Sequence, residues 1–253
     1  MDPHLNKLKE KIEPMERFVE LFARSLEQPK IRQINFDQGF RYSSPDIRHY
    51  CLLKLIRVIS ALNAAIELAR TGYTQEIAVL MRTLVECTTY IEFVLDPDDS
   101  EEHRATVEKY VREFFEDAHR DAAFGIKNTH IKQGAVHDVL GKSLDAQVAP
   151  EEGRRPAKEL YSNVYRIYSN YVHAKYPEIM DLYGGIPGCF HLHGMRGTPK
   201  DAENLETIQT FIDTASNATA LTISKLNLFS LIETDPFVAS WCNRMRAANT
   251  GLG

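Results

Sequence analysis

The sequence predicts an all-helical protein, folded as a single up-and-down bundle. Apolar residues recur at the three- to four-residue spacing of amphipathic helices through most of the 253 residues. Nothing repeats along the chain, and no charge run or Pro/Ser-rich linker divides it, so we expect one domain. Hydrophobic residues make up 43% of the chain, which is enough at this length to bury a sizeable core.

The first 43 residues are expected to form one helix and one loop. An amphipathic pattern predicts a helix over residues 4–28, with Pro14 as the place where it would kink. Residues 29–43 lack a clear period and are read as a loop. Within the single domain, this N-terminal part (1–43) precedes the core bundle.

The core bundle is predicted over residues 44–235 and begins with a helical hairpin. The segment SPD at 44–46 is a helix start, with serine as N-cap, proline at the first helical position and an acid in the first turn. The helix runs to about Arg70 and ends at Gly72, which can adopt the left-handed conformation of a C-cap. A second helix follows at once, over about 74–95, so the two are antiparallel.

The next stretch is read as a helix followed by a less regular segment. Asp98 and Glu101 have the spacing of a capping box for a helix over about 99–126. Residues 127–154 are mixed in character and predict an irregular segment with a short helix.

The last third alternates helices with one glycine-rich loop. Helices are predicted over about 155–175, 201–232 and 235–247. The loop at 184–198, GGIPGCFHLHGMRGT, holds five of the thirteen glycines. Residues 236–253 are read as a short C-terminal helix and tail.

Composition and charge exclude several classes of protein. A net charge of −5 argues against a broad basic surface for duplex DNA, although a local patch for RNA remains open. The N-terminus is polar and no apolar run of about 18 residues is present, so we expect no membrane span. Four well-separated cysteines fit a reducing compartment, and the expected location is cytoplasmic. They are Cys51, Cys87, Cys189 and Cys242.

One face of the helix at 155–175 carries an unusual set of polar residues. At about 100° per residue, six polar side chains fall within roughly 120°, and none of them is Lys, Glu or Asp. The opposite side is expected to be apolar, formed by Leu160, Val164, Ile167, Tyr171 and Val172. The six residues, called here the polar arc, are Ser162, Asn163, Arg166, Ser169, Asn170 and His173.

Two interpretations of the polar arc stay open. It is either an ordinary wetted or inter-helix face, or a site built for chemistry. In the second case His173 would move a proton and Arg166 would pair with a phosphate. Seven residues separate them, roughly 10 Å along the helix axis, so they would lie at the two ends of one phosphodiester. Ser169 and Asn170 lie between them as groups that could bind a substrate.

A second constellation is formed by Arg82 and Glu86, four residues apart in a helix that is apolar on nearly all sides. One interpretation is an ion pair that holds the bundle together, because charges in such a helix need partners. The other is that they line a cavity faced by His173, where Glu86 would orient the imidazole and Arg82 would contact a phosphate.

The glycine-rich loop supplies a third candidate. If extended, it places Cys189, His191 and His193 on one face, and all three are acceptable zinc ligands. A fourth ligand is not evident, so we expect no metal, and a metal-dependent helical enzyme is kept as a rival interpretation. The loop is otherwise read as a lid, with Arg196 able to reach an anion. No nucleotide-binding or metalloprotease motif is present, and no cofactor is expected.

An arginine followed by a histidine late in a helical bundle resembles the HEPN superfamily of ribonucleases, toxins and nucleotide-handling modules. Here the motif is Arg166-x6-His173. The hairpin ARTGYTQEIAVLMRTLVE and the helix YRIYSNYVH also resemble a group of bacterial HEPN-like proteins. The likeness covers about residues 45–235 in architecture.

The resemblance implies metal-independent RNA cleavage in bacterial stress or phage defence, with two copies of the motif meeting across a homodimer. His173 would be the general acid or base, and Arg166 would stabilise the phosphorane-like transition state. Ile167 departs from the pattern, since many active members carry Asn or Asp after the arginine. Because some members only bind, the alternative is a non-catalytic interaction module of the same fold.

Overall fold

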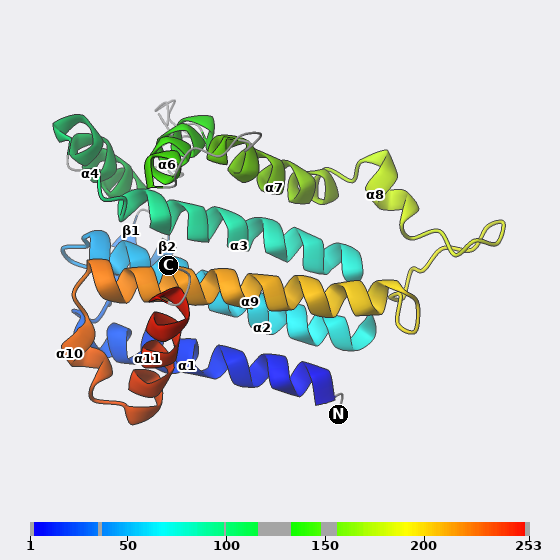
Figure 1. Cartoon of the computed structure of the whole chain (residues 1–253), viewed down its shortest axis with the longest axis horizontal. Coiled ribbons are helices and arrows are strands. Elements are labelled where there is room, and N and C mark those ends of the chain that lie inside the picture. The colour runs from blue at the N-terminus through cyan, green and yellow to red at the C-terminus, as the bar shows by residue number, and fades with distance from the viewer. Residues whose placement is uncertain (1–2, 35–36, 99, 116–132, 148–155, 251–253) are drawn as a thin grey trace.

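The structure, a computed structural model, is a helical bundle and confirms the all-α class (Figure 1). It describes residues 3–34, 37–98, 100–115, 133–147 and 156–250. None of the described helices is both long enough and apolar enough to cross a membrane. Four long helices, α1, α2, α3 and α9, lie side by side, and α7 covers the outer side of α3.

Helix α1 (Pro3–Ser25) contains Pro14 and contributes a continuous buried stripe to the core. Two short strands follow, β1 (Lys30–Ile34) and β2 (Asp37–Arg41), which pair antiparallel. The prediction of a loop over 29–43 is therefore wrong. The hairpin pairs Ile31 with Phe40, and both side chains are exposed, so it left no alternating core pattern in the sequence.

The predicted helical hairpin is confirmed as α2 (Ile47–Thr71) and α3 (Thr74–Val94). Its start was placed two residues early. Asp46, not Ser44, is the N-cap, and its carboxylate accepts hydrogen bonds from the backbone N–H groups of Arg48 and His49. Gly72 caps the C-terminus of α2 in the left-handed conformation, at φ 78°, as predicted.

The following two helices differ from the prediction at their ends. Helix α4 (Glu101–Phe115) begins after Ser100, whose hydroxyl accepts a hydrogen bond from the His103 N–H at 3.1 Å. The capping box predicted at Asp98 is thus replaced by Ser100. Helix α6 (Gln133–Gln147) has 15 residues and lies within 127–154, where an irregular segment with a short helix was expected. The predicted end of the earlier helix, near residue 126, lies outside the described residues.

Five helices complete the chain: α7 (Ala157–Val172), α8 (Tyr176–Met180), α9 (Lys200–Lys225), α10 (Phe229–Ile232) and α11 (Pro236–Thr250). The single helix predicted over 201–232 is two helices, because the chain turns at Asn227, which takes a positive φ of 52°. One hydrophobic cluster runs through the bundle, from Leu5 on α1 to Cys242 on α11.

Two glycines bring the glycine-rich loop against the α2–α3 turn. The Met195 N–H donates a hydrogen bond to the Gly72 carbonyl at 2.7 Å. A Cβ on Gly194 would lie 2.1 Å from the Thr71 carbonyl oxygen, and one on Gly72 would lie 2.3 Å from the Arg196 nitrogen. Arg196 also donates a hydrogen bond to the Arg70 carbonyl. The loop therefore returns to the bundle at a backbone-to-backbone contact that only glycine permits.

We predict that Gly194→Ala destabilises the protein by about 2 kcal/mol or more, through its positive φ and its contact with Thr71. Gly185→Ala is the matched control, since Gly185 has a similar positive φ of 77° but open space around it. The free energy of unfolding of Gly185→Ala should fall by only about 1 kcal/mol, the cost of the left-handed conformation. Urea unfolding measures both, and equal losses would contradict the role assigned to the close approach.

Candidate functional site

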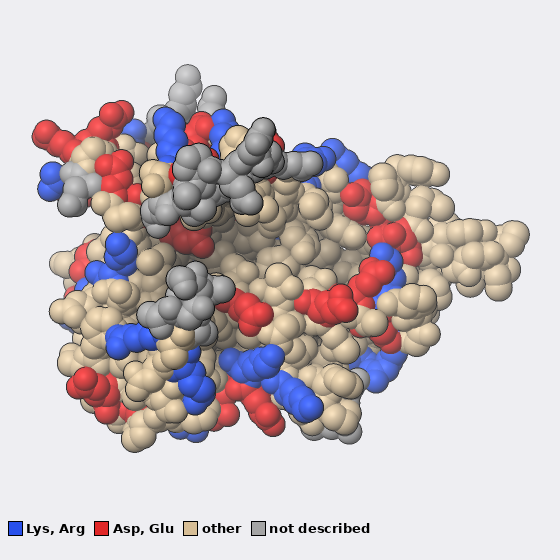
Figure 2. All heavy atoms as spheres, in the orientation of Figure 1, with Lys and Arg blue, Asp and Glu red and all other residues tan. Residues whose placement is uncertain are grey.

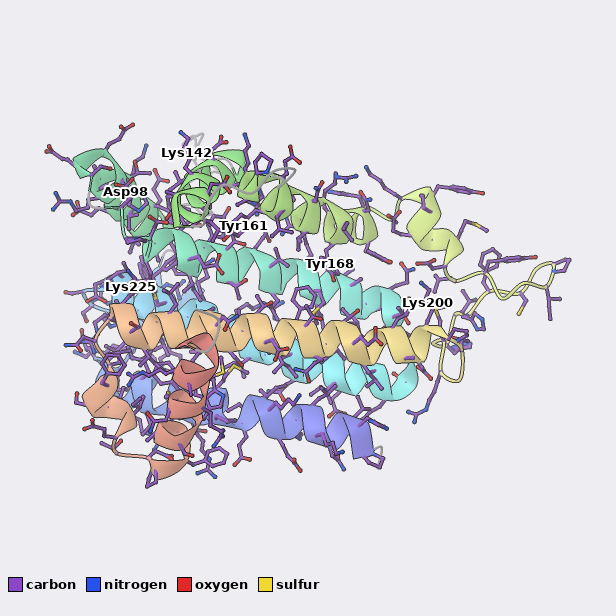
Figure 3. All side chains as sticks on the ribbon, viewed as in Figure 1. Asp98, Lys142, Tyr161, Tyr168, Lys200 and Lys225 are labelled. Atoms are coloured by element: carbon purple, nitrogen blue, oxygen red, sulfur yellow. The ribbon has the colours of Figure 1, made fainter. Side chains whose placement is uncertain are left out.

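Helix α7 packs on the bundle mainly through tyrosines, with one aliphatic residue among them. Tyr161, Val164 and Tyr168 pack against the hydrophobic cluster. Figure 3 shows Tyr161 and Tyr168 on the side of α7 that faces α3 and α9, and the Tyr168 ring lies 5.2 Å from the ring of Phe211 on α9. This face of α7 is called here the tyrosine face.

The expected apolar side of α7 is therefore largely wrong. Of its predicted members, Leu160, Ile167 and Val172 are 62%, 49% and 47% exposed, and only Val164 packs against the hydrophobic cluster. The helix is rotated because the tyrosine rings occupy the interface with α3. Its outward side thus carries aliphatic residues next to the polar arc.

Arg166 and His173 both face solvent. The Arg166 guanidinium donates a hydrogen bond to the Asn163 side chain at 3.2 Å, within the polar arc itself. His173 follows the last residue of α7 and caps the helix, donating its backbone N–H to the Ser169 carbonyl at 3.0 Å. The side chain of His173 is exposed, and that of Ser169 is half-buried. Within one chain, no described residue from another element bonds to the Arg166 or His173 side chain.

Two other members of the polar arc are bonded to neighbouring helices. The Asn170 amide donates a hydrogen bond to Glu178 of α8 at 3.0 Å. The Ser162 hydroxyl lies 3.2 Å from Nδ1 of His137 on α6. Ser162 and Asn170 are therefore tied to neighbouring helices, whereas Arg166 and His173 face solvent.

Arg82 and Glu86 form the ion pair that one of the two interpretations expected. Nη1 of Arg82 lies 2.7 Å from Oε2 of Glu86, with the arginine side chain only 11% exposed. The guanidinium lies 3.5 Å above the ring of Tyr165, which binds α3 to α7 by a cation–π contact. Among the described contacts, neither residue bonds to His173, which lies eight residues beyond Tyr165.

Sequence reasoning missed His137. It is buried between α6 and α7, 6.0 Å from the Tyr161 ring and 5.8 Å from the Tyr165 ring. Burial lowers its pKa, and the charges of Arg82 and Lys158 act in the same direction. Nothing in the local sequence distinguishes His137, because its partners come from two other helices.

The glycine-rich loop forms a projecting arm rather than a flat lid, defined here as residues 182–195 (Figure 1). The Gly184 N–H donates to the Cys189 carbonyl at 2.9 Å, and the His191 N–H donates to the Leu182 carbonyl at 2.8 Å. Cys189 is exposed. In the described part of the chain, no three His, Cys, Asp or Glu side chains are grouped to hold a metal ion, and this includes Cys189, His191 and His193.

Exposed apolar side chains concentrate on α7, α8 and the arm. Of the sixteen large hydrophobic side chains that are exposed in the described residues, ten lie between residues 160 and 192. Figure 2 shows the end of the arm without Lys, Arg, Asp or Glu, and the sequence from Leu182 to Met195 contains none of these four residue types. The ten residues, called here the apolar surface, are Leu160, Ile167, Val172, Tyr176, Ile179, Met180, Tyr183, Ile186, Phe190 and Leu192.

Comparison of the chain with protein families, with curated proteins and with solved structures found no match.

We predict that the protein loses stability as the pH falls below the ordinary pKa of histidine, about 6.5. Because the folded pKa of His137 is lowered, the unfolded chain binds a proton at higher pH than the folded chain does. The contribution is complete above about pH 6.5 and is lost as the pH drops toward the folded pKa.

His137→Phe is the variant that isolates this effect, since it keeps an aromatic ring against Tyr161 and Tyr165 but cannot titrate. Urea unfolding at about pH 7.5 and about pH 5 should give a smaller change in free energy for the variant than for wild type. The same change in both proteins would show that His137 is not responsible.

Proposed function

We propose that the protein is a metal-independent, RNA-cleaving homodimer of the HEPN-like kind, whose site is completed when two copies meet at the apolar surface. The observation that carries this proposal is the outward position of Arg166 and His173 on α7, beside the exposed Ile167 and Val172. Bacterial stress or phage defence is the setting that the resemblance implies.

The chemistry available at Arg166 and His173 suits a phosphodiester. Neutral His173 can take the proton of an RNA 2′-hydroxyl while the 2′-oxygen attacks phosphorus. His173 then returns this proton to the leaving 5′-oxygen, and the products carry a 2′,3′-cyclic phosphate and a free 5′-hydroxyl. Arg166 can stabilise the extra negative charge on the phosphorus oxygens in the transition state.

A single chain offers these two groups only in water, where electrostatic stabilisation is weak. Charge–charge attraction increases severalfold when water is excluded from a site. The residues beside Arg166 and His173 are apolar and exposed, so a covering partner would provide that exclusion. This supports a site that is incomplete in one chain.

The size of the apolar surface supports a second copy as the covering partner. Together its ten side chains expose on the order of 1,000 Å², which is comparable to the roughly 800 Å² that each partner buries in a standard interface. In a two-fold symmetric dimer the same surface of each chain contacts its copy on the other, so the two polar arcs would face each other.

The test is incubation of the purified full chain with mixed RNA in EDTA, beside His173→Ala and Arg166→Ala. We expect wild type to leave 2′,3′-cyclic phosphate ends, and each variant to lose at least about 100-fold in rate. Arg104→Ala, an exposed arginine on α4, is the matched control and should cleave normally. Equal cleavage by wild type and His173→Ala would contradict the proposal.

A second candidate, a non-catalytic interaction module, is favoured by a different observation. Asn170 is bonded to Glu178, Ser162 to His137 and Arg166 to Asn163, so much of the polar arc already has partners. In that case the apolar surface would bind another protein and no RNA would turn over. If wild type and all the variants form a complex through the apolar surface but none of them cleaves RNA, the interaction module is the function.

A further inference from the structure

A cavity of about 1090 Å³ lies on the other side of α7 from the apolar surface, between α3, α6, α9 and α11. Figure 2 shows this face of the molecule hollowed between α7 and α9. Its volume is slightly above the usual range for small-molecule sites, roughly 300–1,000 Å³. Five of its apolar wall residues are Leu95, Leu140, Leu144, Leu221 and Phe229.

One wall of the cavity presents hydrogen-bond acceptors. Glu92 of α3 lines it, and the Tyr161 hydroxyl donates a hydrogen bond to Oε2 of Glu92 at 3.0 Å. Burial raises the pKa of this carboxyl, and the bond from Tyr161 acts against that rise. Asp96 lies one turn further along the same wall. Since a carboxylate accepts up to about four hydrogen bonds, Glu92 has acceptor capacity left for a ligand.

The opposite wall is basic. Lys225 lies at the C-terminal end of α9 (Figure 3) and lines the cavity. Lys225 makes no ion pair with any carboxylate in the described part of the chain. Arg246 of α11 lines the same wall, and its guanidinium lies 4.2 Å above the ring of Phe229. Two cations, one from α9 and one from α11, thus line the cavity together with Phe229.

We propose that this cavity binds a nucleoside phosphate whose base carries an amino group. The flat base would lie among the leucines and Phe229, its amino group would donate to Glu92, and its phosphate would pair with Lys225 and Arg246. A fatty acid would fill the apolar part but offer Glu92 no donor beyond the Tyr161 hydroxyl, so the remaining acceptor capacity of this partly buried carboxylate would go unused. A ligand that uses both Glu92 and the two cations needs a hydrogen-bond donor at one end and an anionic group at the other.

The test is calorimetric titration of the full chain with adenosine 5′-monophosphate. We expect saturable binding, and at least about tenfold weaker binding of adenosine, which lacks the phosphate, and of inosine 5′-monophosphate, which has a carbonyl in place of the amino group. Lys225→Ala combined with Arg246→Ala should weaken adenosine 5′-monophosphate at least about tenfold and leave adenosine unchanged.

Both basic residues are exposed, so the double variant should remain folded, which its melting temperature will verify. Lys200→Ala removes the same charge from the other end of α9 and should bind as wild type does (Figure 3). Absence of saturable binding, equal affinity for adenosine, or an unchanged double variant would each overturn the proposal. A protein that binds the nucleotide but cleaves no RNA would leave this inference intact, because the two sites lie on different sides of α7.

Discussion

The contact between the tyrosine face of α7 and helix α3 determines what the rest of the surface can do. Arg82 is almost fully buried, paired with Glu86 and covered by the ring of Tyr165 at 3.5 Å. A buried arginine without those partners would be strongly destabilising. Because Glu86 lies on α3 itself, it is the ring of Tyr165 on Arg82 that helps to hold α7 in one rotation. That rotation turns Arg166 and Ile167 outward.

The outward rotation has two consequences. It leaves aliphatic side chains of α7 in water, continuous in sequence with those of α8 and the arm, and this is unfavourable unless something covers them. It also leaves Arg166 and His173 at the edge of the same surface. A single association event would therefore bury the apolar residues and change the environment of the polar ones, which links assembly to chemistry in our account.

The arm is held by the glycine contacts at its base. Gly72 ends α2 and also receives the Met195 N–H, so one residue both closes the helical hairpin and fixes the end of the arm. The cap was predictable, because a glycine after a periodic helix is a local signal. The contact between Gly72 and Met195 was not predictable, because the two segments are more than a hundred residues apart and neither contains a local pattern that indicates its partner.

The same division between local and distant information explains the other outcomes. The α2–α3 hairpin follows from helical periodicity and capping residues. The strands at 30–41 bury few side chains, so their sequence shows no alternation of apolar and polar residues. Five of the six residues of the polar arc lie on α7 and His173 caps its end, but the opposite side was assigned by hydropathy alone. Tyrosine faces the bundle instead, since the Tyr165 ring has a partner in Arg82 and the Tyr161 hydroxyl has one in Glu92. His137 and the cavity likewise depend on helices far apart in the chain.

The most direct test of this account is the mass of the protein in solution, measured by light scattering during size-exclusion chromatography. We expect twice the mass of one chain for wild type, and a single chain for Leu160→Glu combined with Ile167→Glu, whose side chains face outward and do not hold the fold. Ile56→Glu, 40% exposed on α2, is the control and should stay dimeric. A wild-type protein that remains a single chain at every concentration would contradict the claim that the apolar surface joins two copies.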